Sequence, residues 1–258
     1  MKVLVKLGGT LLDDADSRNS LGRQLAEVSR RYELVAVHGG GKQVTRYLEE
    51  RGIASRFVGG LRVSDDAVIE AVTKVIAGTV NKQLVSAIVA AGESAVGLSG
   101  IDGPLTTAVQ LSPELGAVGK PVKTDGRLLN LLVNAGHVPV IACVAGDVAG
   151  RIYNVNADQM AVSCALGWGA SKLLFLTDVP GVKDSSGSLI ARLSPGALRH
   201  LISSGVAHGG MQAKLEAAIT ALQGGVEEIT VALGREPGIC HRLLAGESLG
   251  TRILAEVQ

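Results

Sequence analysis

Aromatic side chains are nearly absent from this chain of 258 residues, which has two Phe, three Tyr and one Trp. Proteins that bind single-stranded nucleic acids stack the bases on aromatic side chains. An excess of charge is also missing, because 25 Lys and Arg balance 24 Asp and Glu to a formal net charge of +1. A nucleic-acid binder normally has a basic excess, so both absences argue against a nucleic-acid partner.

No apolar run approaches the ~20 residues that a membrane-spanning helix needs. The start, Met1–Val5, enters a strand pattern at once and does not read as a signal peptide. The 3 cysteines are widely spaced and form neither a CxxC pair nor a zinc signature. We therefore expect a cytoplasmic protein with no membrane partner, no metal-ligating residues, and buried reduced thiols at Cys143, Cys164 and Cys240.

Glycine is abundant by contrast, with 34 residues, nearly twice the average share of about 7%. Most glycines stand where a strand pattern meets a helix pattern, and the two patterns alternate along the chain. This alternation predicts an α/β fold with a mostly parallel sheet that helices cover on both faces. Ligands of such sheets lie beyond the carboxyl ends of the strands. A soft boundary near Asp178 separates a predicted N-terminal lobe, 1–177, from a C-terminal lobe, 178–258.

The apolar patterns predict these strands: 2–7, 34–37, 95–98, 137–143, 172–176, 228–232 and 251–254. They predict these helices: 21–31, 42–51, 127–135, 157–166, 194–203, 210–222 and 238–244. A longer helical stretch runs from the cap cluster at Ser64 to Ala91, either without interruption or with a break at Gly78. Segment 105–123 has no helical period and indicates a hairpin or excursion, and 184–187 indicates a hairpin tip.

Two glycine turns follow predicted strands. Lys6 lies in an apolar strand before Gly8 and Gly9, which indicates either a phosphate site or a lysine that reaches water beside an ordinary turn. Segment 38–42, His-Gly-Gly-Gly-Lys, would expose several N–H groups where a helix begins. It matches neither the P-loop nor the dinucleotide spacing. An ordinary turn rarely needs three consecutive glycines, so we favour an anion site there.

Several polar residues near predicted helix starts allow two interpretations, one functional and one structural. Arg62 could bind a carboxylate through two of its guanidinium nitrogens, although its local sequence favours a surface arginine. Asn154 and Asn156 offer amide hydrogen bonds, and one of them could simply cap the following helix. Asp158 could be a surface acid favoured by the helix dipole, or it could hold a catalytic lysine.

The C-terminal part holds two further candidate segments. Gly209, Gly210 and Met211 open a helix whose Lys214 should point away from the apolar face, to solvent or to a phosphate. Segment 178–182 could contact a nucleotide base or ribose, although an ordinary turn explains its composition equally well. The five histidines have no metal-ligand spacing, and we expect neutral, structural or surface roles for them. No GxSxG nucleophile motif is present.

The ordered set of segments resembles the amino-acid kinase family over nearly the whole chain. Each motif alone is weak, but the set is specific; it comprises 6–9 (Lys-Leu-Gly-Gly), 38–41 (His-Gly-Gly-Gly), 60–63 (Gly-Leu-Arg-Val), 154–158 (Asn-Val-Asn-Ala-Asp), 178–182 (Asp-Val-Pro-Gly-Val), 210–214 (Gly-Met-x-x-Lys) and 250–253 (Gly-Thr-Arg-Ile). The resemblance implies an open three-layer αβα sandwich with a mainly parallel central sheet. The N-terminal lobe would bind the acylated amino acid and dimerise, and the C-terminal lobe would bind ATP.

The implied activity is transfer of the γ-phosphoryl group of ATP to the γ-carboxylate of N-acetyl-L-glutamate, the second step of arginine biosynthesis. Segments 60–63 and 154–159 favour this acceptor within the family. Mg²⁺ would be held mainly by the ATP phosphates. The resemblance implies Lys6, Lys214 and Asp158 as the catalytic residues, with Asp158 orienting both lysines.

The same resemblance implies acceptor-binding residues, with Arg62 on the α-carboxylate: Gly40, Gly41, Arg62 and Asn154. It also implies nucleotide-binding residues: Gly8, Gly9, Asp178, Gly181, Val182, Gly209, Gly210 and Met211. A carboxylate acceptor is already ionised at pH 7, so a missing general base is expected. The enzyme then has to align the reactants and offset charge.

Two other functions compete with this hypothesis. A related kinase could act on another acylated or carrier-linked amino acid, such as aminoadipate. A non-catalytic sensor of amino acid or nucleotide should have lost its phosphoryl-stabilising residues, whereas Lys6, Lys214 and Asp158 are all present. Arginine-inhibited relatives have an extra helix before the first strand, which here starts at Lys2. We therefore expect an arginine-insensitive homodimer.

Overall fold

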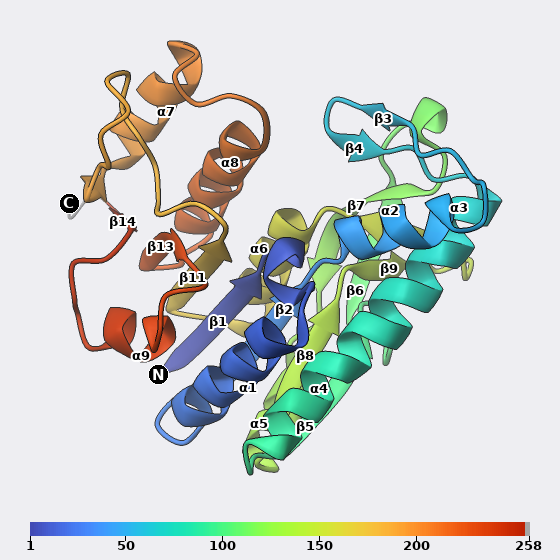
Figure 1. Ribbon diagram of the computed structural model, residues 1–258, viewed down its shortest axis with the longest axis horizontal. Helices are drawn as coiled ribbons and strands as arrows, with labels where there is room; N and C mark the ends of the chain where they lie inside the picture. The colour runs from blue at the N-terminus through green and yellow to red at the C-terminus, as the bar shows by residue number, and fades with distance from the viewer. Residues whose placement is uncertain (256–258) are drawn as a thin grey trace.

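The computed structural model, which describes residues 1–255, is built on one eight-stranded sheet (Figure 1). Among the described residues every pairing in this sheet is parallel except that of β13 with β14. The strand order is β12 (Arg192–Leu193), β14 (Thr251–Leu254), β13 (Glu228–Leu233), β11 (Lys172–Thr177), β1 (Lys2–Leu7), β2 (Glu33–His38), β8 (Val138–Ala142) and β5 (Ala95–Ser99).

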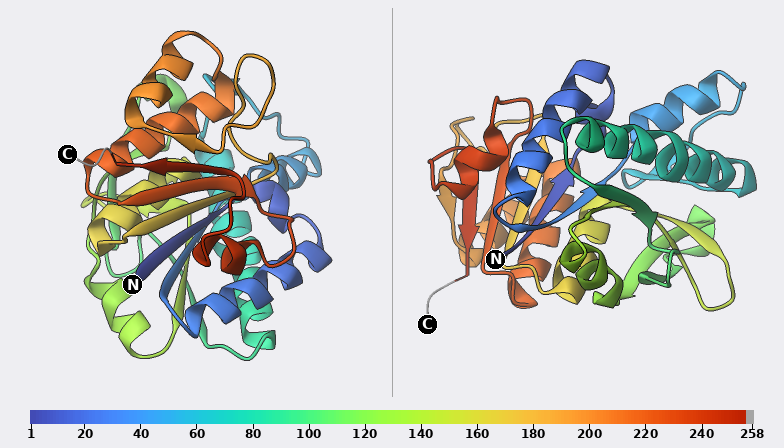
Figure 2. Two further views of the ribbon diagram at one scale, coloured as in Figure 1. Left: turned by 90° about the vertical axis from the view of Figure 1, so that its left-hand side faces the viewer. Right: turned by 90° about the horizontal axis from the view of Figure 1, so that it is seen from below.

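Helices cover both faces of the sheet, as the views in Figure 2 show. One face carries α1 (Ala15–Ser29), α4 (Asn81–Ala90) and α9 (Ile239–Leu244). The other face carries α5 (Arg127–Asn134), α6 (Ala157–Trp168), α7 (Pro195–Ser203) and α8 (Gly209–Gln223). The predicted three-layer αβα sandwich with a mainly parallel sheet is confirmed.

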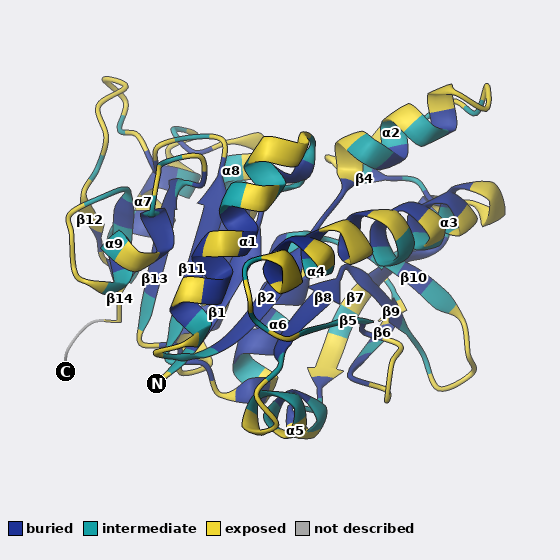
Figure 3. Cartoon of the chain, turned by 60° about the horizontal axis from the view of Figure 1, so that its bottom comes forward, coloured by how far each residue is buried: buried dark blue, intermediate teal, exposed yellow. Residues whose placement is uncertain are grey.

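The hydrophobic core is divided by the sheet into two halves. Successive strand residues point to opposite faces, so Leu4 and Phe175 pack with α6 and α8, whereas Val5 and Leu174 pack with α1 and α4. Both faces are therefore apolar, and the strands read as continuous hydrophobic runs. Figure 3 shows the consequence: the central strands β1, β2, β8 and β11 are almost wholly buried, and the helices that cover them expose their outer faces.

The helix predicted from Ser64 to Ala91 is continuous. It consists of α3 (Asp66–Val72), capped by the Asp65 side chain, a π-helical segment η2 (Thr73–Val80), and α4. Gly78 lies inside η2 and does not interrupt the helix. The first helix, predicted from residue 21, instead begins at Ala15 because the Asp14 carboxylate accepts the Ser17 N–H at 2.7 Å.

The predicted excursion is a hairpin of β6 (Thr106–Gln110) and β7 (Val118–Thr124), separated by the short 3₁₀ helix η3 (Pro113–Leu115). It closes into a small barrel with β9 (Val144–Gly146) and β10 (Ile152–Val155), strands that the sequence patterns did not reveal. A further unpredicted hairpin, β3 (Phe57–Val58) and β4 (Leu61–Arg62), lies above α2 (Gly41–Glu49) (Figure 1).

The carboxyl ends of the central strands bring distant segments together. Strand β1 leads into the 3₁₀ helix η1 (Gly9–Leu12), and its neighbour β2 leads into the 39–41 glycines and α2. Strand β11, on the other side of β1, leads into Asp178. The predicted edge for ligands therefore carries the glycine turns of β1 and β2 side by side.

Candidate active site

Two lysines meet one carboxylate at the centre of the molecule. Lys6 comes from β1, Asp158 from the first turn of α6, and Lys214 from α8. Lys6 Nζ lies 2.7 Å from Asp158 Oδ1, and Lys214 Nζ lies 2.8 Å from Asp158 Oδ2. All three residues are buried, with 7%, 8% and 6% of the surface of Lys6, Asp158 and Lys214 exposed. We call these residues the lysine–aspartate triad.

The triad carries one uncompensated positive charge in a desolvated setting. Burial alone would raise the pKa of the Asp158 carboxyl, but the two ammonium groups outweigh it and hold that pKa below its ordinary value. Burial and the nearby Lys6 charge lower the pKa of Lys214, and Asp158 opposes this shift. The Phe175 ring lies 5.0 Å from Lys214 Nζ and favours the cation through its π-face.

Local structure decides between the interpretations left open for α6. The Asn156 side chain caps α6, since its Oδ1 accepts the N–H groups of Asp158 at 2.9 Å and Gln159 at 3.2 Å. Asp158 is buried and paired with both lysines, so it is not a surface acid. Of the two directions expected for Lys214, to solvent or to a phosphate, the first is wrong, because its ammonium group is buried and donates to the Asp158 carboxylate.

The glycine turns of β1 and β2 touch each other. A Cβ atom on Gly9 would lie 3.3 Å from the backbone nitrogens of both Gly40 and Gly41. These nitrogens belong to the start of α2, where N–H groups have no partner within the helix. A helix start of this kind attracts anions through its N–H groups and dipole. The lack of side chains keeps the space between the turns open to a ligand.

A cavity of about 220 Å³ lies beside these turns. Its lining includes all four residues expected to bind the acceptor, together with Gly9: Gly40, Gly41, Arg62 and Asn154. Asn154 Nδ2 donates to Ser64 Oγ at 3.2 Å, which orients its amide at the end of β10. Sequence reasoning missed the apolar wall, where Val72 and Ile76 from the long helix line the same cavity.

Arg62 is buried, contrary to what its local sequence favoured. Its guanidinium group donates to Ser55 Oγ at 2.5 Å, to Gly41 O at 2.9 Å and to Thr45 Oγ1 at 2.6 Å. The Phe57 ring covers the guanidinium at 4.7 Å. These bonds use three of the five guanidinium N–H groups, one on Nη1 and both on Nη2, so the Nε–H and one Nη1–H are not used by them.

Six of the eight nucleotide candidates lie in the C-terminal part of the chain, whereas Gly8 and Gly9 follow β1. Asp178 is exposed at the end of β11, close enough for its charge to act on Lys214. Gly181 and Val182 are buried against β14, and Thr251 Oγ1 accepts the Val182 N–H at 2.8 Å. Gly209, Gly210 and Met211 form the first turn of α8. Of the eight nucleotide candidates, only Gly9 lines the acceptor cavity.

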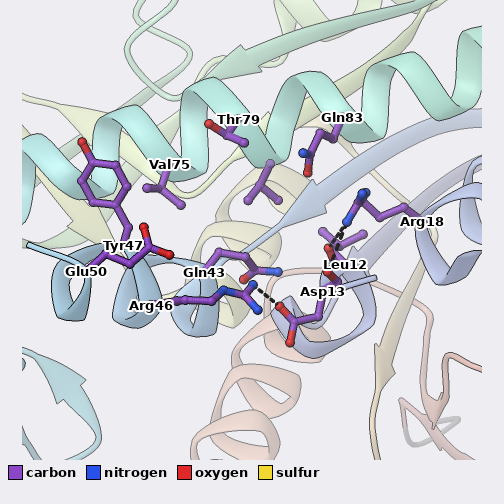
Figure 4. Close-up of a pocket in the computed structure, with 11 residues that line it drawn as sticks. Leu12, Asp13, Arg18, Gln43, Arg46, Tyr47, Glu50, Val75, Thr79 and Gln83 are labelled. Carbon is purple, nitrogen blue, oxygen red and sulfur yellow. Dashed lines mark hydrogen bonds and ion pairs between the residues drawn. The ribbon is translucent and has the colours of Figure 1, made fainter. Parts of the chain in front are cut away.

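A larger cavity of about 380 Å³ lies between α2, η1 and the long helix (Figure 4). Its charged side chains satisfy groups of the same chain: Arg46 pairs with Asp13 at 2.6 Å, and Arg18 donates to Leu12 O at 3.0 Å. Gln43 Nε2 donates to Gly9 O at 3.0 Å. The polar side chains around this cavity therefore support the glycine turn, and they provide no buried cation for a phosphoryl group.

Three further observations concern metal ligands, membrane-spanning helices and cysteines. Within residues 1–255, no group of three His, Cys, Asp or Glu side chains could hold a metal ion. No helix in that part of the chain combines the length and the apolarity needed to cross a membrane. The three cysteines are free and buried, as predicted.

Buried ammonium groups and unpaired N–H groups are the partners that a phosphoryl group needs during transfer. The fold and the site thus define a phosphotransferase. The chain belongs to the amino acid kinase family, whose family model matches residues 1–232. The resemblance inferred from its motifs is confirmed.

Individual relatives show which members of the family this chain is similar to. The chain is 56% identical to an acetylglutamate kinase of Solibacter usitatus, a match that covers 98% of this chain and 99% of the relative. It is 41% identical to an acetylglutamate kinase of Cereibacter sphaeroides, over 97% of this chain and 87% of the relative. Like these relatives, the protein is a kinase.

Solved structures show the same fold. An N-acetylglutamate synthase of Neisseria gonorrhoeae, complexed with coenzyme A and N-acetyl-glutamate, matches all of this chain and 60% of its own, with a TM-score of 0.88 and 26% identity. A carbamate kinase of Giardia lamblia bound to AMP-PNP matches 98% of both chains, with a TM-score of 0.71 and 13% identity.

The triad predicts how stability depends on pH. The lowered pKa of Asp158 stabilises the fold above the unfolded-state pKa of about 3.9, and this contribution is lost as pH falls through the folded-state pKa. Asp158→Asn should cost about 3–5 kcal/mol at pH 7, because it leaves two buried ammonium groups without a counter-charge. Urea titrations at pH 7 and pH 3 should show a smaller loss on acidification in Asp158→Asn than in the wild type.

Asp66→Asn is the matched control, because Asp66 is an exposed acid in the first turn of α3. It should cost less than about 1 kcal/mol. Equal losses in both variants would contradict the stabilising role of the triad.

Proposed function

We propose that this kinase phosphorylates the γ-carboxylate of N-acetyl-L-glutamate with ATP, as the second step of arginine biosynthesis. The lysine–aspartate triad carries the proposal, because it supplies two buried cations, and Ala157, the neighbour of Asp158 in α6, lines the cavity proposed for the acceptor. Relatives named acetylglutamate kinase at 56% and 41% identity support this acceptor.

The chemistry needs no general base. A γ-carboxylate has an ordinary pKa of about 4.3 and is ionised at pH 7. One of its oxygens attacks the γ-phosphorus in line, a new P–O bond forms, and the bond to ADP breaks. Lys6 and Lys214 would offset negative charge on the transferring oxygens, and Asp158 would hold both ammonium groups in place.

The acceptor would lie in the cavity beside the glycine turns. The two free N–H groups of Arg62 suit the α-carboxylate, and the Asn154 amide suits the acylated amine or the carbonyl next to it. The backbone nitrogens of Gly40 and Gly41 lie next to Gly9, where the γ-carboxylate and the phosphoryl group would meet.

ATP, as its magnesium complex, would bind the C-terminal lobe, 178–258, and the acceptor the N-terminal lobe, 1–177. Asp158 is already paired with two ammonium groups and does not suit direct coordination of Mg²⁺. We therefore assign the metal to the ATP phosphates and water. The proposed nucleotide contacts are Gly8, Gly9, Asp178, Gly181, Val182, Gly209, Gly210 and Met211.

A homodimer and a cytoplasmic location complete the proposal. Strand β5 forms one edge of the sheet, and such an edge can pair with a second copy of the chain. Val89 on the adjacent helix α4 is 52% exposed, which adds apolar surface next to this edge. Three free buried thiols are consistent with a reducing compartment.

The direct test measures ADP release from MgATP with a panel of acceptors: N-acetyl-L-glutamate, L-glutamate, L-aspartate, N-acetyl-aminoadipate and UMP. The proposal predicts strong turnover with N-acetyl-L-glutamate alone. Turnover with N-acetyl-aminoadipate instead would favour the related kinase. ATP binding without turnover of any acceptor would favour a carrier-linked substrate or a sensor.

Loss of either lysine should slow the chemical step. Lys6→Met and Lys214→Met each remove one cation from the phosphoryl group and should lower kcat about 10²–10³-fold. Lys74→Met is the control, because Lys74 is exposed on η2. Steady-state kinetics with N-acetyl-L-glutamate decide the matter, and a kcat within about three-fold of wild type for either buried lysine would refute its assignment.

Replacement of Arg62 should separate acceptor binding from ATP binding. Arg62→Lys keeps the charge but loses the bidentate geometry, so KM for N-acetyl-L-glutamate should rise about ten-fold or more while KM for ATP stays constant. An equal rise in both KM values would indicate a general loss of structure and contradict the specific role.

A further inference from the structure

Two buried side chains behind the glycine turn have no part in the proposed chemistry. His38, the last residue of β2, and Asn81, the first residue of α4, both have 0% exposed surface. Asn81 Nδ2 lies 3.0 Å from His38 Nε2, and His38 Nδ1 lies 2.9 Å from the carbonyl oxygen of Gly39. A chain of hydrogen bonds therefore joins the long helix to the glycine turn.

The surroundings fix the donor and the acceptor in both hydrogen bonds that join Asn81, His38 and Gly39. Asn81 Nδ2 also lies 2.9 Å from Val140 O, and Asn81 Oδ1 lies 3.1 Å from Lys82 Nζ, so the amide nitrogen must face His38. The Gly39 carbonyl can only accept, so His38 Nδ1 donates to it and Nε2 accepts from Asn81. This tautomer belongs to a neutral ring.

The electrostatic setting favours the neutral ring. Burial lowers the pKa of His38 to about 4, the Gly39 carbonyl opposes this shift, and the nearby Lys82 charge adds to it. The titratable groups that face His38 are Lys82 from α4 and the Cys143 thiol, which donates to His38 O at 2.7 Å. The ring therefore stays neutral at pH 7.

The orientation of one peptide plane depends on this ring. The C=O of Gly39 and the N–H of Gly40 belong to the same trans peptide and point in opposite directions. When His38 holds the carbonyl on its own side, the Gly40 N–H is directed to the other side. The Gly40 nitrogen lies 3.3 Å from the place where a Cβ of Gly9 would be, in the space between the two glycine turns.

Asn81 fits in its position because the residue of β5 next to it, Gly97, has no side chain. A Cβ on Gly97 would collide with Asn81 Oδ1 and lie 2.6 Å from Lys82 Nζ. Glycine inside a strand weakens it and commonly marks a close approach. The turn is also held from the same helix by apolar contact, since a Cβ on Gly40 would lie 3.1 Å from Ile76.

We propose that Asn81 is a positioning residue, which acts through the Nδ1–H tautomer of His38 to aim the Gly40 N–H at the transferring phosphoryl group. This inference rests on the proposed function for its substrate. It also links the phosphoryl site to β5, because Lys82 Nζ donates to Gly97 O at 3.0 Å in that edge strand.

The test compares Asn81→Ala with Gln24→Ala. Both remove a buried amide, and the Gln24 amide accepts the Cys240 N–H at 3.3 Å far from the glycine turn. Asn81→Ala should lower kcat about ten-fold or more with KM for ATP unchanged, and Gln24→Ala should leave both within about two-fold of wild type. Equal kinetics for the two variants, with an active wild type, would overturn the inference and leave the proposed function standing.

A second pair of variants keeps the test decisive where Asn81→Ala does not fold. In His38→Asn the amide nitrogen can occupy the position of Nδ1 and donate to Gly39 O. In His38→Gln the amide can occupy only the position of Nε2. His38→Asn should therefore retain more activity than His38→Gln, and the reverse order would overturn the inference.

Nitrogen-15 NMR of the histidine rings gives a readout that does not depend on turnover. A protonated Nδ1 on His38 supports the inference, and a protonated Nε2 overturns it. A wild type that phosphorylates none of the acceptors would instead contradict the proposed function, and the NMR result would still decide the state of His38.

Discussion

The pairing of two ammonium groups with one buried carboxylate is the constraint on which the site depends. Lys6 from β1 and Lys214 from α8 meet on Asp158 of α6, so three elements that are distant in the sequence are joined at one point. A buried charge without a partner would cost far more than the fold can provide. The triad therefore fixes the relative positions of the two parts of the chain and leaves one positive charge for an anionic ligand.

Glycine complements these charges by leaving backbone N–H groups accessible. Side chains at Gly9 or Gly40 would fill the narrow space between the turns of β1 and β2 or press against the long helix. Arg62 and Asn154 line the cavity beside these turns, so the proposed carboxylate site lies next to the proposed phosphoryl site. In the proposed reaction this arrangement would stabilise charge during transfer and would require neither a nucleophile nor a base from the protein.

Local patterns predicted the layers of the fold well but not the burial of polar residues. The alternation of strands and helices predicted the sandwich, and the rule that ligand edges lie at the carboxyl ends of strands predicted that the glycine turns after β1 and β2 lie at one edge. The burial of Arg62 depends on Phe57, Ser55 and Thr45, which only the folded chain brings around it. Asn81 was hidden within a long helical pattern, and the glycine in the middle of β5 was its one visible signal.

The central claim is that both lysines of the triad contact the phosphoryl group during transfer. A crystal structure with MgADP, N-acetyl-L-glutamate and a planar metal fluoride would test it most directly, because the fluoride imitates the transferring group. The account predicts Lys6 Nζ and Lys214 Nζ within about 3 Å of the fluorides, from opposite sides, while Asp158 still holds both. A fluoride complex bound elsewhere, or one that leaves either ammonium group in contact with Asp158 alone, would contradict the account.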